Sequence, residues 1–274
     1  MIEVRAENIS VTIADKPILA NVSITARPGE ITALIGPNGA GKSTFLSALS
    51  GDLKLSSGAA HLGSTDVSAA SAKELSRLRS VMLQDTSVAF SFLVRDVVEM
   101  GRRPWAGSVS AEQDSLIVDA ALHATNMTHL QARDSLTLSG GERARMAMSR
   151  VLAQRTPVVF LDEPTAAMDI RHQEQTLGLA RRLAQGGATV IVVLHDLNAA
   201  AAYADHVVCL SQGKVVSDGT VREVYTSENL SEIYGWPIDV VELESGRMHV
   251  SPRDGHEESH ADPAQLDVLL GDRS

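Results

Sequence analysis

The sequence predicts an α/β fold in which a helical insertion interrupts a core of strands and helices. Three observations support this class. The first 35 residues contain short stretches in which apolar and polar residues alternate, as in strands. From about residue 90 to 154 the apolar spacing is helical, and from residue 157 onward apolar strands alternate with helical stretches. We therefore expect an α/β core with an insertion near residues 85–155.

Apolar runs bounded by turn residues mark the strands, and capping residues mark the helices. Ser110 and Gln113, for example, form a capping box that begins a helix ending near Thr125. The expected strands lie within 2–26 and at 31–35, 75–83, 157–162, 188–196, 206–210 and 214–219. The other expected helices lie at about 42–49, 169–185 and 196–204.

The composition changes near residue 245. Residues 246–274 are polar, with one late apolar run, LDVLL, and we expect them to form a loosely attached tail. The folded domain then spans residues 1–245, with its core at about 1–84 and 156–245.

Charge and composition exclude several classes of protein. The chain has 274 residues and a net charge of −10, which argues against a protein that grips nucleic acid phosphates. Its single cysteine, Cys209, cannot form an internal disulfide, and its apolar surroundings predict a buried side chain rather than a reactive thiol. The start does not resemble a signal peptide, and no apolar run approaches the ~18 residues of a membrane span. We expect a cytosolic protein whose membrane role, if any, goes through a partner.

The stretch GPNGAGKST matches the P-loop pattern in full. Its glycines let successive backbone N–H groups face a phosphate, Lys42 supplies positive charge to the β and γ phosphates, and the Ser43 hydroxyl is a ligand for Mg²⁺. A strand leads into the loop and a helix leads out. The expected nucleotide-binding residues are Gly36, Pro37, Asn38, Gly39, Ala40, Gly41, Lys42, Ser43 and Thr44.

Two acidic residues end the buried strand VVFLD. Adjacent side chains of an extended chain point to opposite sides, so the two carboxylates can have different roles. We expect Asp162 to hold Mg²⁺ through water and Glu163 to orient and polarise the attacking water. An acidic turn after a strand is the alternative.

Two polar residues follow other expected strands. His195 ends the run TVIVVL, where it contacts a γ-phosphate or serves as a hydrogen-bonded structural residue. Gln84 follows SVML, and we expect it to reach Mg²⁺ or the attacking water.

The stretch LSGGE contains a second potential anion site. Ser139 and Glu142 form a capping box for a following helix, which is the simpler interpretation. That interpretation leaves Gly140 and Gly141 unexplained, because each glycine costs about 1 kcal/mol in helix propensity. Paired glycines suit a helix N-terminus that another surface approaches closely.

The P-loop, Gln84, LSGGE, LDEPT, AAMD and the later histidine, in this order, resemble the ATP-binding subunit of an ABC transporter over residues ~1–240. The resemblance implies a P-loop NTPase core with an antiparallel β part and a helical subdomain. It also implies a head-to-tail homodimer that hydrolyses ATP with Mg²⁺. In that dimer Ser139, Gly140, Gly141 and Glu142 would face the ATP of the partner, and Asp169 would cross the interface.

Longer stretches are similar to importers of iron chelates, cobalamin and haem, and SVAFSFLVRDVVEMGR is most similar to the haem group. This resemblance implies integral membrane permease subunits, a substrate-binding protein in the complex, and a place at the cytoplasmic face of the inner or plasma membrane. A ferric siderophore or cobalamin importer is the alternative. A non-transport ABC ATPase acting on DNA or ribosomes, or a P-loop kinase or nucleotide switch, fits less well.

The sequence departs from the family pattern in two places. An aromatic residue usually stacks on the adenine, yet no aromatic occurs before Phe45, and the corresponding position falls at or near Ile13. TAAMD also differs from the usual residues before Asp169. Residues 86–105 contain several apolar side chains, including Val88, which we assign either to the helical core or to a groove for a permease helix.

Overall fold

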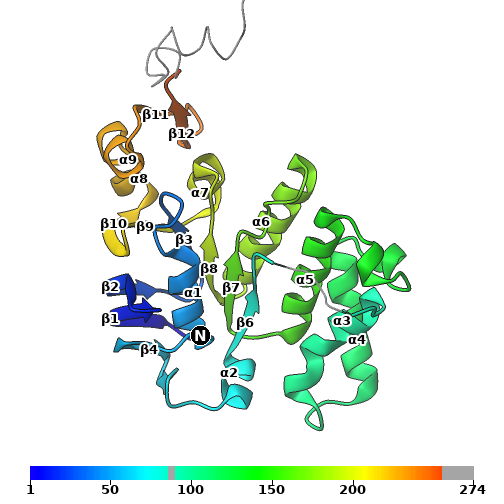
Figure 1. The fold of residues 1–274 in the computed structure, drawn as a ribbon. Coiled ribbons are helices and arrows are strands. Elements are labelled where there is room, and N and C mark those ends of the chain that lie inside the picture. Colours follow the sequence, from blue (N-terminus) through cyan, green and yellow to red (C-terminus); the bar gives the residue numbers. More distant parts are fainter. Residues whose placement is uncertain (86–89, 255–274) are drawn as a thin grey trace, which may run out of the picture.

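The computed structural model describes residues 1–85 and 90–254. Its centre is a six-stranded sheet of order β10-β9-β3-β8-β7-β6 (Figure 1). Neighbouring strands are parallel, except that β10 runs antiparallel to β9. The fold class predicted from the sequence is confirmed. The strands are β3 (Ile31–Ile35), β6 (Arg79–Met82), β7 (Val158–Asp162), β8 (Thr189–Val193), β9 (His206–Ser211) and β10 (Lys214–Thr220).

Both faces of this sheet are buried. In β7, Val159 and Leu161 belong to a core shared with α5 (Gly140–Gln154) and α6 (Ile170–Gln185). Val158 and Phe160 face the other way, into a core shared with α1 (Lys42–Ser50). Because the central strands β3, β7 and β8 meet water on neither face, they are nearly continuous apolar runs, whereas alternate residues of the edge strand β10 are exposed.

A second, antiparallel sheet of order β2-β1-β4-β5 packs on the α1 side of the molecule (Figure 1). Its strands are β1 (Val4–Ile13), β2 (Lys16–Ala26), β4 (Ser57–Leu62) and β5 (Thr65–Asp66). Next comes helix α2 (Ala72–Leu78), so the strand expected over 75–83 is wrong for its first half. The physical reason is a capping box in which Ser71 and Glu74 satisfy each other's backbone N–H groups.

The insertion is helical, as the sequence predicts. It contains α3 (Val94–Glu99), a 3₁₀ segment (Met100–Trp105), α4 (Ala111–Ala124), two short 3₁₀ turns (Thr128–Leu130, Ser135–Thr137) and α5. Its apolar core includes Val98, Leu122 and Met146, whereas Met148 of the same α5 helix packs in the core of the sheet. Helix α5 therefore joins the insertion to the sheet. Within residues 1–85 and 90–254, no helix combines the length and apolarity needed to cross a bilayer.

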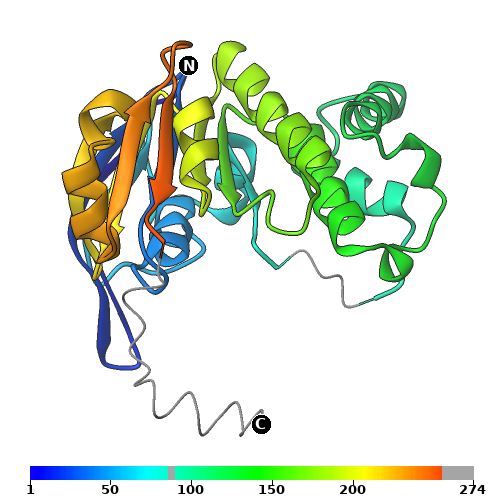
Figure 2. The ribbon, with the colours of Figure 1, turned by 90° about the horizontal axis from the view of Figure 1, so that it is seen from above.

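The last described elements form a small C-terminal unit. They are α8 (Val221–Val224), α9 (Ser227–Tyr234), β11 (Ile238–Glu242) and β12 (Met248–Pro252), and β12 contacts α7 (Leu197–Tyr203), which lies before β9 in the chain. Strands β11 and β12 pair as a hairpin, and Val250 is buried beside α7 (Figure 2). The boundary expected at residue 245 falls in the turn of this hairpin, so residues 248–252 are folded rather than part of a loose tail. The polar turn lowers the average hydrophobicity and hides the short alternation of β12. The rest of the expected tail, residues 255–274, lies outside the described residues, as does Val88.

Candidate nucleotide site

The carboxyl ends of β3, β6, β7 and β8 meet at one edge of the sheet, where a cleft of about 790 Å³ opens. Ligands bind at this edge in α/β sheets because loops and helix N-termini converge there. The structure brings most of the predicted site residues together in it. The cleft is lined by Lys16, Ile18, Asn38, Gly39, Ala40, Gly41, Lys42, Ser43, Thr44, Gln84, Glu163 and His195.

Residues 36–44, here called the phosphate loop, wrap around the start of α1. Gly36 has a φ of 137°, and a Cβ there would lie 1.9 Å from the carbonyl oxygen of Leu210, so only glycine fits. No side chain caps the first turn of α1, whose N–H groups are therefore open to an anion. The Lys42 ammonium donates to the carbonyl oxygens of Gly36 (2.7 Å) and Pro37 (3.0 Å). It is thereby held within the loop.

Asp162 lies beneath this loop and is almost fully buried. The Ser43 hydroxyl donates to its Oδ1 at 3.1 Å. Burial raises the pKa of Asp162, and burial also lowers the pKa of Lys42, although Glu163 and Asp162 act in the opposite direction on Lys42. A hydroxyl and a carboxylate are oxygen ligands of the kind that Mg²⁺ prefers, so these two residues fit a Mg²⁺ that is completed by phosphate and water.

Glu163 turns away from Asp162, toward two residues from neighbouring strand ends. Its φ of 48° is unusual for a residue with a side chain, and its N–H donates to the carbonyl oxygen of Val193. Gln84 Nε2 donates to Glu163 Oε2 at 2.9 Å, and His195 Nε2 lies 2.5 Å from Glu163 Oε1. Both carboxylate oxygens are thus oriented by partners. Such a carboxylate can hold and polarise a water at the mouth of the cleft.

Comparison with known proteins agrees with this arrangement. A family model described as ABC transporter matches residues 19–166, more than half of the chain. A protein from Rhodococcus jostii (strain RHA1), named Hemin import ATP-binding protein HmuV, is 46% identical over 92% of this chain and 87% of its own length. The chain belongs to the ABC transporter family. It is an ATP-binding and ATP-hydrolysing subunit.

Another relative and two solved structures are also similar to this chain. The protein of the same name from Streptomyces coelicolor is 47% identical over 86% of this chain and 84% of its own length. A metal-chelate type ABC transporter solved in an inward-facing conformation has a TM-score of 0.78 and 27% identity, covering 92% of this chain and 98% of that chain. The ATP-binding cassette MJ0796 bound to ADP and Pi has a TM-score of 0.73, with coverage of 80% and 99%, and at 24% identity it shows the fold alone.

The family's LSGGE motif, residues 138–142, begins helix α5. The capping box exists: Glu142 N–H donates to Ser139 Oγ (3.3 Å), and Ser139 N–H donates to Glu142 Oε2 (2.7 Å). That backbone hydrogen bond lowers the pKa of Glu142. In the described part of the chain, none of residues 139–142 lines the cleft of the phosphate loop. The structure therefore leaves this motif apart from the chain's own nucleotide cleft.

The glycine pair of this motif lies against the chain's own loop before α6. A Cβ on Gly141 would be 3.0 Å from the carbonyl oxygen of Ala167, and a Cβ on Gly140 would be 3.3 Å from the Cβ of Ala167. The sequence analysis inferred that another surface approaches these glycines closely, and the loop that contains Ala167 is one such surface. Asp169, at the end of the loop, caps α6 by accepting from His172 N–H at 2.9 Å, which lowers the pKa of Asp169.

The flank of the cleft where the ABC family usually places its aromatic residue is aliphatic here. Ile13 ends β1 and is 46% exposed, while Lys16 and Ile18 of β2 line the cleft. As the sequence analysis expected, the position at or near Ile13 has no aromatic side chain to stack on the adenine.

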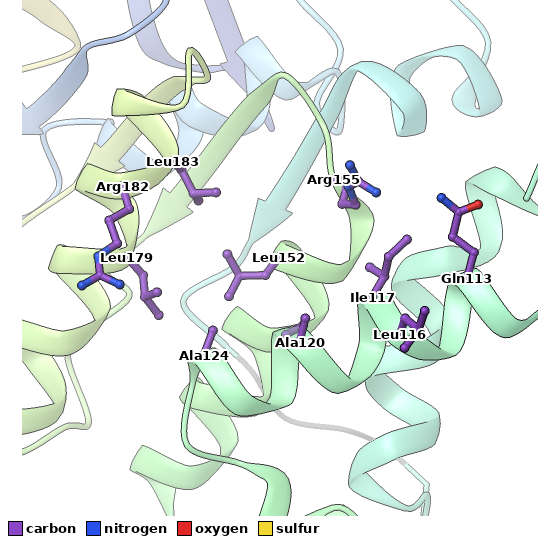
Figure 3. Close-up of a pocket in the computed structure, with 11 residues that line it drawn as sticks. Gln113, Leu116, Ile117, Ala120, Ala124, Leu152, Arg155, Leu179, Arg182 and Leu183 are labelled. Atoms are coloured by element: carbon purple, nitrogen blue, oxygen red, sulfur yellow. The ribbon is translucent and has the colours of Figure 1, made fainter.

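A second hollow, of about 470 Å³, lies between α4, α5 and α6 (Figure 3). Leu116, Ile117, Leu152, Leu179 and Leu183 make its lining mostly apolar. Among the described residues that line it there is no carboxylate and no glycine loop. The chemistry of the family's reaction is therefore assigned to the cleft of the phosphate loop.

Sequence reasoning missed a side chain that hydrogen-bonds to the phosphate loop. The hydroxyl of Tyr234, in α9, accepts a hydrogen bond from Gly36 N–H at 3.0 Å. The two residues are separated by 198 positions. No spacing motif marks Tyr234, so a single sequence offers no signal for it.

Proposed function

We propose that this ABC subunit hydrolyses ATP to drive the uptake of haem through a membrane permease. The observation that supports the cargo is the set of relatives that are 39–48% identical and are named Hemin import ATP-binding protein. The solved metal-chelate type transporter supports the wider class of cargo. A ferric siderophore or cobalamin remains the alternative cargo, and we assign no nucleic acid partner.

The proposed reaction follows from the contacts of the cleft. Lys42 and the N–H groups at the start of α1 hold the phosphates of ATP. Ser43 and Asp162 hold Mg²⁺, which supplies charge neutralisation when bound. Glu163 polarises the attacking water, because Gln84 and His195 fix both of its oxygens. His195 lines the cleft, where its imidazole would also contact the γ-phosphate of a bound ATP.

The working unit is proposed to be a head-to-tail homodimer. Residues 139–142 begin helix α5, where the capping box engages the N–H groups of Ser139 and Glu142 but not those of Gly140 and Gly141, yet all four residues stand apart from the chain's own cleft. In the proposed dimer they face the ATP of the other copy, and Asp169, whose side chain is 67% exposed, lies at the interface.

Mixing two inactive variants tests the dimer. Lys42→Ala removes the phosphate cation, and Gly140→Asp places a negative charge at the start of α5, where it repels phosphate. Each variant alone should be inactive. An equal mixture should regain up to about a quarter of the wild-type activity, because random pairing makes about half of the dimers mixed and each mixed head-to-tail dimer has one intact site of two. Mixtures that stay inactive, although the variants exchange subunits, would contradict the shared site.

The proposed permease surface follows Gln84. Phe90, Phe92 and Leu93 are 72%, 36% and 45% exposed, whereas Val94 and Val98 are buried. Of the two alternatives for residues 86–105, the helical core thus accounts for Val94 and Val98, and a permease contact accounts for the exposed side chains. The chain would then act at the cytoplasmic face of the membrane, with a substrate-binding protein in the complex.

Growth of a deletion strain tests the cargo. With haem as the only iron source, the strain should fail to grow, and the wild-type chain should restore growth while Glu163→Gln should not. Parallel cultures on a ferric siderophore and on cobalamin-dependent medium separate the alternatives. Normal growth on haem with loss of growth on a siderophore would reassign the cargo.

A further inference from the structure

The entrance of the phosphate loop is a glycine that other residues hold through its backbone N–H and carbonyl groups. Gly36 is the first residue of the loop, and the carbonyl oxygen of Leu210 leaves no space for a side chain there. Its carbonyl oxygen accepts from Lys42, and its N–H donates to the hydroxyl of Tyr234. If Lys42 turns to the phosphates of ATP, as its proposed role requires, it would release the carbonyl of Gly36. The hydrogen bond to Tyr234 is then the side-chain contact that still holds this residue.

The helix that carries Tyr234 is itself fixed. Ser231 Oγ accepts from Ile238 N–H at 2.9 Å, which fastens α9 to β11. Asn229 Nδ2 donates to the carbonyl oxygen of Val224 (2.7 Å) and to Ser217 Oγ (3.2 Å), which fastens α9 to α8 and β10. Burial also raises the pKa of Tyr234, so its hydroxyl stays neutral. The acceptor offered to Gly36 is therefore well ordered.

The same unit also contacts the segment after His195. Tyr225 donates to the carbonyl oxygen of Leu197 at 2.9 Å. Asn198 donates to the carbonyl oxygen of Val250 and accepts from its N–H, at 3.1 and 2.8 Å. The C-terminal unit thus contacts the phosphate loop and the start of α7, the helix that follows the cleft residue His195.

We infer that Tyr234 is a positioning residue for ATP binding: from the C-terminal unit, its hydroxyl holds Gly36 and so keeps the phosphate loop in the shape that receives phosphates. The inference rests on the proposed role of residues 36–44. Tyr234 does not touch the nucleotide, so its effect appears in affinity more than in the rate of the bound complex.

Tyr234→Phe tests this by removing one hydroxyl. Losing the acceptor should weaken MgADP and MgATP binding about fivefold, as measured by calorimetry. The kcat at saturating ATP should stay within about twofold of wild type. Amide hydrogen exchange of a nucleotide-free peptide that covers residues 31–44 should become faster, because the Gly36 N–H has lost its partner. Peptides within α6 should keep their exchange rates.

Tyr203→Phe is the matched control, since its hydroxyl bonds to Glu174 Oε2 at 2.7 Å, away from the phosphate loop. It should leave nucleotide affinity and loop exchange unchanged. Lys42→Ala, measured in parallel, separates this inference from the proposed function. If Lys42→Ala loses binding while Tyr234→Phe matches wild type in affinity and exchange, the role of Tyr234 is refuted. If Lys42→Ala binds normally, the assignment of the phosphate loop itself fails.

Discussion

The Nε2 atom of His195 lies 2.5 Å from Oε1 of Glu163. The two residues follow the adjacent parallel strands β8 and β7, so the sheet itself sets their separation. With Gln84 on the other oxygen, the Glu163 carboxylate is held from both sides by side chains of the chain itself. This preorganisation is the basis of the first prediction.

Glu163→Gln should reduce ATP turnover by about 10²–10⁴-fold, because an amide cannot accept the proton of an attacking water. Affinity for ATP should remain near the wild-type value, since the phosphate loop is untouched. Phosphate release and nucleotide binding measure the two effects separately. Glu244→Gln, in the exposed turn of the β11–β12 hairpin, should change neither. Turnover at the wild-type rate in Glu163→Gln would refute its role.

Asp162→Asn should stabilise the nucleotide-free protein at neutral pH while impairing Mg²⁺-dependent hydrolysis. Burial raises the pKa of Asp162 in the folded state, so between its unfolded and folded pKa values the folded state binds more protons. The carboxylate therefore makes wild-type stability fall as pH rises through that window. Above the folded pKa the full cost of burying the carboxylate is present, and below the unfolded pKa this cost is absent. Urea unfolding of both proteins from pH 3 to 8 should show that the free energy of unfolding of Asp162→Asn exceeds that of the wild type by an amount that grows with pH. A difference of the opposite sign would contradict the assigned cause.

Gly141→Ala should destabilise the protein by about 1–3 kcal/mol, because the new methyl group meets the carbonyl oxygen of Ala167 at 3.0 Å. Gly178→Ala is the matched control: it lies inside α6, its Cβ would meet nothing within 4 Å, and it should stabilise by about 0.5–1 kcal/mol. Urea unfolding measures both. The ATPase rate of Gly141→Ala should also fall, since the displaced loop carries Asp169. Equal effects of the two substitutions would show that close packing does not explain Gly141.

Ile13→Tyr should tighten ATP binding about fivefold or more, because base stacking on an aromatic ring contributes roughly 1–3 kcal/mol. Ile13 is half-exposed beside the cleft, so a ring can be added there without disturbing the core. Calorimetry with ATP and GTP should show the gain in nucleotide affinity. Ile13→Leu, which adds no ring, should bind as wild type does. Unchanged affinity in Ile13→Tyr would place the adenine elsewhere.

Local signals in the sequence were sufficient to predict many of the strands, the phosphate loop and the residues of the cleft. The buried strands appear as apolar runs, and the phosphate loop appears as a contiguous pattern because its function needs neighbouring backbone N–H groups. Asp162, Glu163 and His195 could be assigned to one site because the carboxyl ends of parallel strands meet at one edge of a sheet. The capping box of Ser139 and Glu142 is likewise complete within four residues.

Two further elements depend on local contacts that the sequence analysis did not use: the capping box of Ser71 and Glu74 begins the helix over residues 72–78, and the pairing of β12 with β11 includes residues 248–252 in the fold. Other features depended on residues that are distant in the chain. The approach of Ala167 to Gly141 and the hydrogen bond from Gly36 to Tyr234 are tertiary contacts. The sequence was sufficient to indicate the groups that we propose perform the chemistry, because these groups occur in short patterns. The tertiary structure alone decided what holds those groups in place, because each support is a contact between segments that only the packed fold brings together.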